Sequence, residues 1–241
     1  MNFFEVRPAD RQPETVRAMF GSIATRYDLA NHVLSCGSDF SWRKRAARIV
    51  SNWNPGRVLD LAAGTGDLTL ALQKKLPSAE IVAADFSEEM LAVAKAKGVR
   101  QIITADALAL PFGEGSFDCV TIAFGLRNIQ DWGAALREMS RILSDNGHLL
   151  VMEFSLPTMS ILRGPYRFYL HRLLPIVGSL LTGKKSAYDY LGDSIEQFPG
   201  GDAMLRLIEA NGFRSATAEP LSGGVVTIYT AVKSATASGS R

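Results

Sequence analysis

The sequence predicts an α/β fold, with a mostly parallel sheet covered by helices on both faces. Between residues 60 and 154, short apolar runs alternate with longer amphipathic runs, which is typical of repeated strand–helix units. Residues 57–69 (RVLDLAAGTGDLT) read as a buried strand followed by a glycine turn that opens a helix. With 241 residues, 47% of them hydrophobic, the chain can bury one sizeable core, and we expect a single domain over residues 1–233.

The individual elements follow from their patterns and their ends. Ser87 is a suitable N-cap for a helix that carries Glu88 and Glu89 in its first turn and extends to Lys97, with Gly98 after its end. Further helices are expected over residues 132–143 and 203–211. Strands are expected near residues 57–61, 80–84, 101–104, 117–123, 148–154 and 225–232.

Two segments do not belong to the alternating core. Residues 12–52 are mainly helical in pattern, and residues 157–200 form a long insertion rich in leucine, aromatic and basic residues. Ligands of open α/β sheets bind beyond the carboxyl ends of the strands, so both additions are expected to cover a pocket there, although most leucines of the insertion would serve ordinary helix packing. The small, polar residues 234–241 are expected to be disordered.

Composition and charge exclude several classes of function. The net charge is +2, from 26 basic and 24 acidic residues, so no strong positive field suggests a nucleic-acid partner. Cys36 and Cys119 are too few for a disulfide framework or a zinc site, and three histidines add no ligand spacing, so we expect no metal and a reducing cytoplasm. The N-terminus lacks the uninterrupted apolar core of a signal peptide, and the apolar residues 173–181 fall far short of the roughly 20 that span a membrane.

The glycine turn after the first strand predicts a nucleotide-cofactor loop. Gly64 and Gly66 would let the backbone approach a ligand closely, and the helix that follows offers free N–H groups. Asp67, Leu68 and Thr69 follow Gly66, so the third glycine of the G-x-G-x-x-G dinucleotide fingerprint is missing and NAD is disfavoured. The pattern Asp60-x-Ala62-x-Gly64-x-Gly66 resembles the D-x-G-x-G-x-G loop of S-adenosylmethionine-dependent methyltransferases, with Ala62 in the first glycine's place.

Two further acids stand at the ends of predicted strands. Asp85 ends the second strand, where it could accept hydrogen bonds from a ribose diol, and Asp106 follows the third, where it could accept from an adenine amine. Each acid alone is also a common helix cap or turn former. Their occurrence together with the glycine loop favours the cofactor interpretation.

Several longer motifs resemble one family, the ubiquinone/menaquinone biosynthesis C-methyltransferases. Residues 26–43 (RYDLANHVLSCGSDFSWR) resemble its N-terminal signature, and residues 117–129, which contain FGLRN, resemble a second motif followed by a helix at 135–143. The similarity continues through residues 153–155, 187–199 and 212–213, so it covers about residues 15 to 232.

The resemblance implies a class I methyltransferase fold with a seven-stranded Rossmann-like sheet, S-adenosylmethionine as methyl donor and a demethylated isoprenoid quinol as acceptor. Its cofactor residues fall on Thr65, Asp85, Asp106 and Ala107. The chain departs from the family pattern at Ala123, where some members have a serine credited with a cofactor contact, and at residues 38–40, where many members read x-His-Arg.

The chemistry of such an acceptor directs attention to four residues. Methylation of a quinol ring carbon requires a neighbouring phenolate, which a fixed guanidinium can stabilise; Arg127 is our candidate, with Asn128 orienting it or the ring. The alternative for Arg127 is a buried ion pair with a nearby carboxylate. Tyr27 and Asp28 could pass a proton through water, or Tyr27 could instead bind the cofactor's carboxylate or pack as a half-buried aromatic. His32, His148 and His171 are weaker candidates.

The basic residues of the insertion suggest a hypothesis about location. They are Arg163, Arg167, Arg172, Lys184 and Lys185. This segment could rest on an anionic membrane surface, peripheral to the inner face of the membrane, or it could be an ordinary solvated helix face.

Rival functions are a methyltransferase for another small molecule and a non-catalytic cofactor-binding subunit of a quinone-biosynthesis complex. The sequence leaves open the naphthoquinol or benzoquinol ring, the tail length and the oligomeric state, a homodimer among the alternatives.

Overall fold

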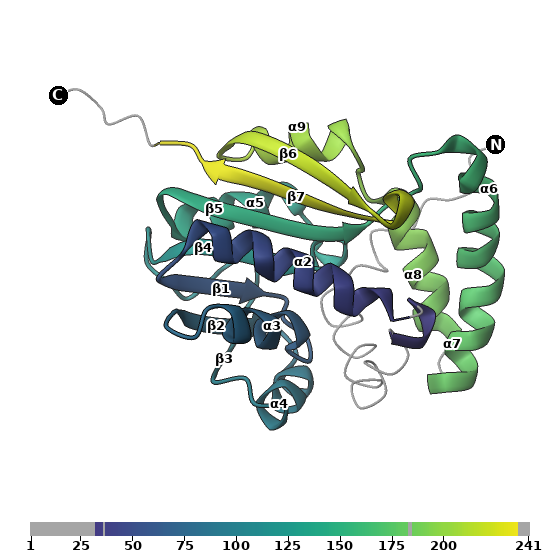
Figure 1. The fold of residues 1–241 in the computed structure, drawn as a ribbon, viewed down its shortest axis with the longest axis horizontal. Coiled ribbons are helices and arrows are strands. Elements are labelled where there is room, and N and C mark those ends of the chain that lie inside the picture. Colours follow the sequence, from purple (N-terminus) through teal and green to yellow (C-terminus); the bar gives the residue numbers. More distant parts are fainter. Residues whose placement is uncertain (1–31, 36, 183–184, 236–241) are drawn as a thin grey trace.

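The computed structural model describes residues 32–235, except residues 36 and 183–184. Its centre is one seven-stranded sheet in the order β3-β2-β1-β4-β5-β7-β6 (Figure 1). The pairs from β3 to β5 are parallel, whereas β7 runs antiparallel to β5 and to β6. The strands are β1 (Arg57–Leu61), β2 (Glu80–Asp85), β3 (Gln101–Thr104), β4 (Phe117–Ala123), β5 (Leu143–Phe154), β6 (Phe213–Leu221) and β7 (Val226–Lys233).

Helices cover both faces of the sheet, as predicted. Successive side chains of a strand point to opposite faces, so β1 sends Val58 to one face and Leu59 to the other, and both are fully buried. The Val58 face packs against α2, α3 and α4, and the Leu59 face packs against α5 and α9. These helices are α2 (Ser38–Trp53), α3 (Asp67–Lys75), α4 (Glu88–Ala96), α5 (Trp132–Ile142) and α9 (Asp202–Glu209).

The segment between β5 and α9 is helical and stands beyond the carboxyl ends of the parallel strands (Figure 1). One arm runs through α6 (Ser160–Phe168), the π-helical turn η3 (Tyr169–Leu173) and α7 (Leu174–Thr182). The other arm, α8 (Lys185–Gln197), packs beside it. The predicted insertion at 157–200 therefore contains helices, and its role on the substrate side stays a prediction.

Most predicted elements occur at the expected places, with local differences. Ser87 caps α4 by accepting a hydrogen bond from the backbone N–H of Met90. The fifth strand begins earlier than expected, at Leu143, because α5 passes directly into β5. The start of β5 is irregular, with a positive φ at Asn146 and a register shift against β4. The edge strand β6 was not among the predicted strands. Residues 12–31 and 236–241 lie outside the described residues.

The sheet topology creates a place for a ligand. The chain leaves β1 toward β2 and β3 on one side and then returns to form β4 on the other side of β1. At such a switch point the loops after neighbouring strands diverge and leave a crevice at their carboxyl ends. The short 3-10 helix η2 (Leu126–Asn128) follows β4 at this edge, while η4 (Ser222–Gly224) joins β6 to β7.

Candidate functional site

A cavity of about 440 Å³ lies at this switch point and is bordered by the loops that follow β1, β2, β3 and β4. It brings together most of the residues that the sequence marked for a cofactor. Gly66 is the exception among them, since it is not part of the lining. The lining includes Asp60, Ala62, Gly64, Thr65, Asp85, Asp106 and Ala107.

The glycine turn after β1 has the shape that a close ligand approach requires. Gly64 has a φ of +56°, and a Cβ built on it would meet no atom of the described residues within 4 Å, so these residues leave open space beside its backbone. Gly66, at +83°, serves packing instead, because a Cβ there would lie 2.6 Å from the side chain of Val99. Ala62 also has a positive φ, of 51°, and its methyl group fits only because Gly125 has none: a Cβ on Gly125 would lie 2.5 Å from the Cβ of Ala62.

Asp60 places a buried carboxylate at the floor of the cavity. Its Oδ2 accepts a hydrogen bond from Thr69 at 2.5 Å, and its Oδ1 accepts one from Thr121 at 2.7 Å. Burial raises the pKa of Asp60 to about 6, although the two hydroxyls and the nearby guanidinium of Arg43 favour the charged form. The carboxylate is therefore expensive to keep ionised and would gain from a cationic ligand group.

Asp85 and Asp106 combine the two roles that the sequence left open. Oδ2 of Asp85 accepts from the backbone N–H of Gly64 at 2.8 Å, and its Oδ1 accepts from the N–H of Ser87 at 2.9 Å. Burial raises the pKa of Asp85, and these backbone bonds oppose the rise. Asp106 is exposed and accepts from the N–H of Leu108 at 2.9 Å. Both acids are thus turn formers, and both also line the cavity.

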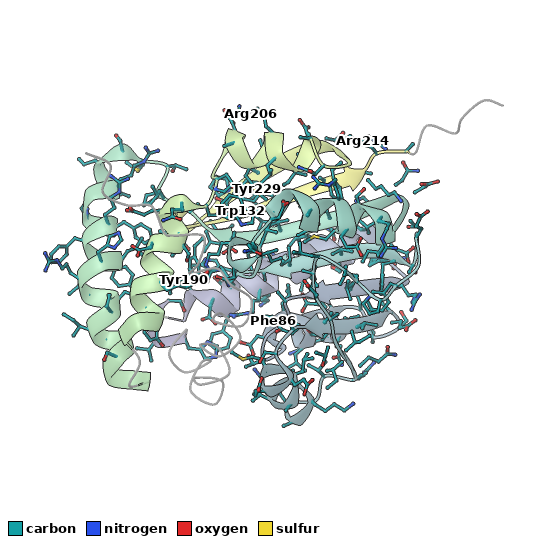
Figure 2. The ribbon with its side chains drawn as sticks, turned by 180° about the vertical axis from the view of Figure 1, so that it is seen from behind. Phe86, Trp132, Tyr190, Arg206, Arg214 and Tyr229 are labelled. Atoms are coloured by element: carbon teal, nitrogen blue, oxygen red, sulfur yellow. The ribbon has the colours of Figure 1, made fainter. Side chains whose placement is uncertain are left out.

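Part of the cavity lining is an apolar wall, and the sequence prediction did not include it. Phe86 directly follows Asp85 at the end of β2 (Figure 2), Met90 lies in the first part of α4, and Leu108 and Ile129 come from the loops after β3 and β4. A flat ring that carries polar groups would fit between such a wall and the acids. The position of Phe86 could have been inferred, since it is the next residue after a strand-end acid.

Arg127 occupies the alternative position that the sequence left open. Its guanidinium is 3% exposed and forms an ion pair with the fully buried Glu153, at 2.6 Å between Nη1 and Oε1. Nη1 also donates to the carbonyl of Phe124, and the backbone N–H of Arg127 donates to Oε2 of Glu153 at 3.2 Å. Burial raises the pKa of Glu153, which the charge of Arg127 opposes. Arg127 does not line the cavity, and this pair fixes the turn that carries the next residues.

Asn128 does line the cavity, and it connects the cavity to the helical insertion. Its Oδ1 accepts a hydrogen bond from the hydroxyl of Tyr190 on α8 at 3.2 Å. Tyr190 lies on the side of α8 that faces the sheet (Figure 2). The segment at 157–200 therefore contacts the site through at least one side chain, and the sequence prediction did not include Tyr190 as a site residue.

Comparison with known proteins decides the family. The model of the ubiE/COQ5 methyltransferase family matches residues 9–233. The chain belongs to the ubiE/COQ5 methyltransferase family. A demethylmenaquinone methyltransferase of Thermus thermophilus is 47% identical over 216 residues, which cover 88% of this chain and 98% of that protein. A ubiquinone/menaquinone biosynthesis C-methyltransferase UbiE of Geobacter sp. is 40% identical over 228 residues, covering 91% and 97%.

Solved structures support the predicted fold of this ubiE/COQ5 family member. A SAM-dependent methyltransferase from Thermotoga maritima aligns with a TM-score of 0.66 at 18% identity, covering 90% of this chain and 99% of that one. Human N-acetylserotonin methyltransferase aligns with a TM-score of 0.58 at 19% identity, covering 87% and 56%. At these identities the likeness concerns the fold, which is the class I methyltransferase fold expected from the sequence.

Both departures from the ubiE/COQ5 pattern are visible in the structure. Ala123 lines the cavity with a methyl group where a serine would offer a hydroxyl. Asp39, the middle residue of the second departure, lies in the first turn of α2, where it is 3% exposed and accepts a hydrogen bond from the hydroxyl of Ser35 at 2.8 Å. Burial alone would raise the pKa of Asp39, but this hydrogen bond and the charge of Arg43 outweigh burial and lower it.

Some predicted residues fall outside the part of the chain that the structure describes. Tyr27 and Asp28 are among them, so their proposed roles stay predictions. His148 stacks on Trp53 with ring centroids 4.5 Å apart and does not line the cavity, and His171 lies beside Asp193 and Glu196. Among the described residues, no helix has both the length and the apolar character needed to cross a membrane.

Proposed function

We propose that this family member is an S-adenosylmethionine-dependent C-methyltransferase whose acceptor is a demethylated isoprenoid quinol. The observation that carries the proposal is the family match over residues 9–233, joined to an acid-lined cavity at the switch point of the sheet. The most similar relatives described above are named for demethylmenaquinone methylation or for ubiquinone/menaquinone biosynthesis. The ring, naphthoquinol or benzoquinol, is left for experiment.

The cavity residues fit the cofactor group by group. Asp85 would accept from the ribose hydroxyls, since a carboxylate has about four lone-pair sites and those of Asp85 are only partly used by backbone N–H groups. The exposed Asp106 and the backbone of Ala107 would bind the adenine edge, with Phe86 and Met90 against its faces. Asp60 and Thr65 border the end that would hold the amino acid part. When bound, S-adenosylmethionine supplies an electrophilic methyl group on a sulfonium centre.

The acceptor would lie on the side of Asn128. Ring carbon attack requires the adjacent quinol hydroxyl to be ionised or strongly hydrogen-bonded, and Asn128 offers a side-chain amide at the cavity wall that Tyr190 holds in place. Arg127 remains our proposed source of positive charge. Its Nε is buried and has no hydrogen-bond partner among the described residues, although Arg127 itself does not line the cavity. Tyr27 and Asp28 remain the proposed carriers of the proton.

Methyl transfer from labelled S-adenosylmethionine tests the proposal. The purified protein is offered reduced demethylmenaquinol and the demethylated benzoquinol side by side. We expect turnover of at least one quinol, and a loss of about 100-fold or more in Asn128→Ala, because electrostatic stabilisation of a developing oxyanion is worth about that much. Arg206→Ala is the matched surface control, since Arg206 is exposed on α9 away from α8 (Figure 2).

Arg127 needs a separate control for folding, because its removal would leave the buried Glu153 without its partner. Breaking a buried pair in this way costs about 3–5 kcal/mol, so Arg127→Ala alone could abolish activity by unfolding the chain. The double variant Arg127→Met/Glu153→Gln keeps the site neutral. Loss of turnover in a folded double variant that still binds the cofactor would support the role of Arg127.

The outcomes also separate the rival functions. Cofactor binding with no turnover of either quinol would overturn the proposal in favour of another small-molecule acceptor or a non-catalytic subunit. Failure to bind S-adenosylmethionine would overturn the cofactor assignment itself. A homodimer stays a prediction, which sedimentation of the purified protein would test.

We also propose that the arm formed by α6, η3 and α7 rests on an anionic membrane surface, where a lipid-tailed quinol resides. Between Glu153 and Asp189 the sequence has five basic residues and no acidic one. Of the ten large apolar side chains that are exposed among the described residues, seven lie between residues 159 and 177, including Ile161 at 76% and Phe168 at 60% exposure. Exposed apolar groups beside uncompensated positive charge are the pattern of an interfacial helix.

The basic residues of this arm differ in how they are paired. Arg167 forms an ion pair with Glu196 on α8 at 2.9 Å. Arg163 donates to the carbonyl of Pro157, and neither it nor Arg172 has an acidic partner among the described residues. Lys184 lies outside the described residues, as does the side chain of Lys185. Arg163 and Arg172 are therefore the described cations most available to lipid phosphates.

Vesicle flotation tests the membrane proposal. We expect binding to vesicles with anionic lipid, weaker binding to neutral vesicles, and a large reduction in both Ile161→Asp/Phe168→Asp and Arg163→Glu/Arg172→Glu. Arg206→Glu/Arg214→Glu is the matched charge reversal on α9 and β6 (Figure 2) and should bind as wild type. Equal binding to neutral and anionic vesicles by every variant would overturn the proposal.

A further inference from the structure

The cavity contains several carboxylates and very little positive charge. Four of its lining residues are aspartates, and Arg43, on α2, is the one basic side chain among the described lining residues. Its guanidinium lies 5.8 Å from the centre of the Phe124 ring. Its charge also lowers the pKa of Asp60, although burial and the hydrogen bonds from the two threonine hydroxyls affect this pKa more. Arg43 thus stands where β1, β4 and the glycine turn meet. The four aspartates are Asp60, Asp67, Asp85 and Asp106.

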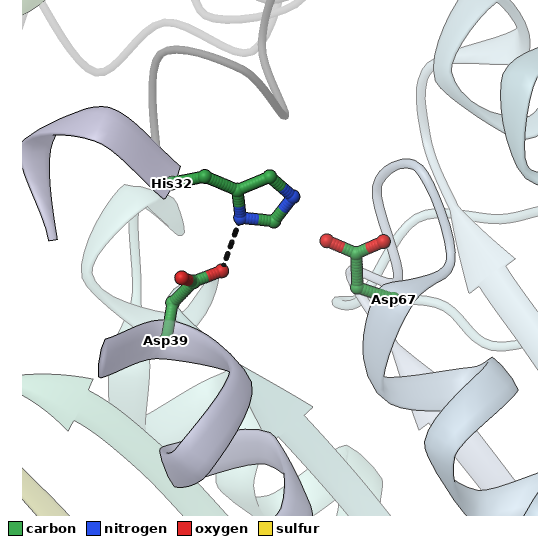
Figure 3. Close-up of side chains that lie close together, drawn as sticks. All are labelled: His32, Asp39 and Asp67. Carbon is green, nitrogen blue, oxygen red and sulfur yellow. Dashed lines mark hydrogen bonds and ion pairs between the residues drawn. The ribbon is translucent and has the colours of Figure 1, made fainter. Parts of the chain in front are cut away.

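Two carboxylates hold Arg43 in this position. Asp39, one turn earlier on α2, accepts a hydrogen bond from Nη1, and Asp67 at the start of α3 lies 3.6 Å from Nη2. The Arg43 side chain is 12% exposed, so its position is well fixed. Figure 3 shows the carboxylates of Asp39 and Asp67 on either side of the His32 ring. Nδ1 of His32 contacts Oδ2 of Asp39 at 2.6 Å, and Lys97 forms an ion pair with Asp67.

Arg43 has unused hydrogen-bonding capacity. A guanidinium has five N–H donors, and the described contacts of Arg43 include one hydrogen bond, to Asp39. The contact with Asp67, at 3.6 Å, is an ion pair and longer than a hydrogen bond. Several N–H groups of a fixed, mostly buried cation therefore remain for a ligand, and a guanidinium fits a carboxylate in a paired, planar arrangement.

The proposed cofactor has one group that requires such a partner. This inference rests on the proposed function: S-adenosylmethionine carries a sulfonium and an ammonium group, which suit the aspartates, and one carboxylate, which they would repel. Asp67 lies at the same end of the cavity as the glycine turn, so an unshielded carboxylate would be disfavoured there. We propose that Arg43 binds the carboxylate of the cofactor's amino acid part and that Asp39 positions Arg43 for this contact.

Calorimetric binding of two ligands tests the proposal without turnover. The ligands are S-adenosylmethionine and its decarboxylated form, which lacks only the carboxylate. For each variant we take the dissociation constant of the decarboxylated form divided by that of S-adenosylmethionine. This ratio isolates the carboxylate contact and falls when the contact is lost. We expect Arg43→Gln to reduce the preference for the carboxylated ligand by about 10- to 100-fold, the usual worth of a hydrogen-bonded charge pair, with little change in affinity for the decarboxylated form.

Matched variants make the result specific. Arg45→Gln removes a neighbouring arginine of α2 that pairs with Glu219 and does not line the cavity, so it should leave the ratio unchanged. Asp39→Asn should lower the ratio less than Arg43→Gln does, and Arg43→Lys should restore part of it. This graded response is not expected if Asp39 only stabilises α2. A thermal melt of each variant confirms that it is folded.

The contradicting results are distinct from those of the proposed function. An unchanged ratio in folded Arg43→Gln would overturn the inference and assign the carboxylate to the backbone N–H groups of the glycine turn or to Tyr27. In that case wild type would still bind S-adenosylmethionine, and the proposed function would stand. If wild type bound neither ligand, the proposed function itself would fail.

Discussion

At the scale of single residues, the carboxylate of Asp60 should make stability depend on pH. Its pKa is about 6 in the folded state, against an ordinary value near 4, because it is buried. An acid with a raised pKa binds protons more tightly when folded, so stability falls as pH rises from about 4 to about 6 and then stays level. Wild type should therefore lose up to about 3 kcal/mol of unfolding free energy across this window from Asp60 alone.

The variant Asp60→Asn removes that loss. It keeps groups that can bond to Thr69 and Thr121, so we predict that it is more stable than wild type at pH 8 and equal to or less stable than wild type at pH 4. Urea unfolding at both pH values measures the difference. A stability change of the same size at pH 4 and pH 8 would contradict the raised pKa.

A second prediction at this scale concerns the backbone of Ala62. Its φ of 51° costs a residue with a Cβ about 1–2 kcal/mol, whereas glycine adopts it freely. Ala62→Gly removes this cost. Glycine also gives the unfolded chain more conformational entropy, which lowers the free energy of unfolding by about 0.4–1 kcal/mol, so we expect a net gain of about 0.5 kcal/mol in the free energy of unfolding. The neighbour Ala63 has no positive φ, so Ala63→Gly should destabilise. Chemical denaturation of both variants should therefore show changes of opposite sign in the free energy of unfolding.

The sequence predicted that three acids would meet at one edge of the sheet because each stands at or near the end of a strand, and their roles toward the cofactor stay predictions. Asp60, Asp85 and Asp106 border the cavity, since parallel strands bring their carboxyl ends to one edge. The sequence indicated Arg127 as a candidate residue but could not predict its contacts. Its partner Glu153 is 26 residues away on β5, and only the packed structure brings the two together. Arg43 was missed as a cavity residue because its position depends on how α2 packs beside α3.

At the scale of elements, β6 shows why a strand can escape prediction. Its sequence, FRSATAEPL, has few β-branched residues and contains Pro220, and most of its side chains are exposed. Such a pattern is tolerated because β6 lies at the edge of the described sheet and pairs there with β7 only. The strands β1, β2 and β4 were predicted because buried parallel strands are almost continuously apolar, and β7 because it is rich in β-branched residues.

The contact between α8 and η2 gives a prediction for this scale. The hydroxyl of Tyr190 orients Asn128, so Tyr190→Phe should raise KM for the quinol by about 2- to 10-fold, the worth of one hydrogen bond. The affinity for S-adenosylhomocysteine should not change, because the cofactor side of the cavity is built from other loops. Tyr169→Phe removes a similar bond to the carbonyl of Leu34, which does not line the cavity, and serves as control. A fall in cofactor affinity instead would refute this division.

At the scale of the whole molecule, the cavity links the two packed faces of the sheet. Its walls combine α2 and the start of α3 from one face with the loop after β4 that leads into α5 on the other. A ligand that bridges these parts should stabilise the fold as a unit. S-adenosylhomocysteine at a hundred times its Kd would add about 2.7 kcal/mol, which for a chain of this size raises Tm by about 5–10 °C.

A thermal melt with and without S-adenosylhomocysteine measures that shift. Adenosine, which has the ribose and base but no amino acid part, is the comparison ligand at the same molar concentration, where its weaker binding should give a smaller shift. Two separate transitions, of which only one moves with ligand, would show that the faces unfold independently and would contradict the prediction.

The contact between Ala62 and Gly125 restricts the order in which the chain can change during evolution. With Ala62 present, any side chain at position 125 would collide with its methyl group, so glycine is compulsory there. Once Ala62 is replaced by glycine, the space is released and Gly125→Ala should be tolerated, since Gly125 has an ordinary φ of −111°. Gly125→Ala is therefore tolerated only after Ala62→Gly has occurred, whereas Ala62→Gly is tolerated first. A comparison of the single variant Gly125→Ala with the double variant would reveal this dependence as a large, favourable coupling.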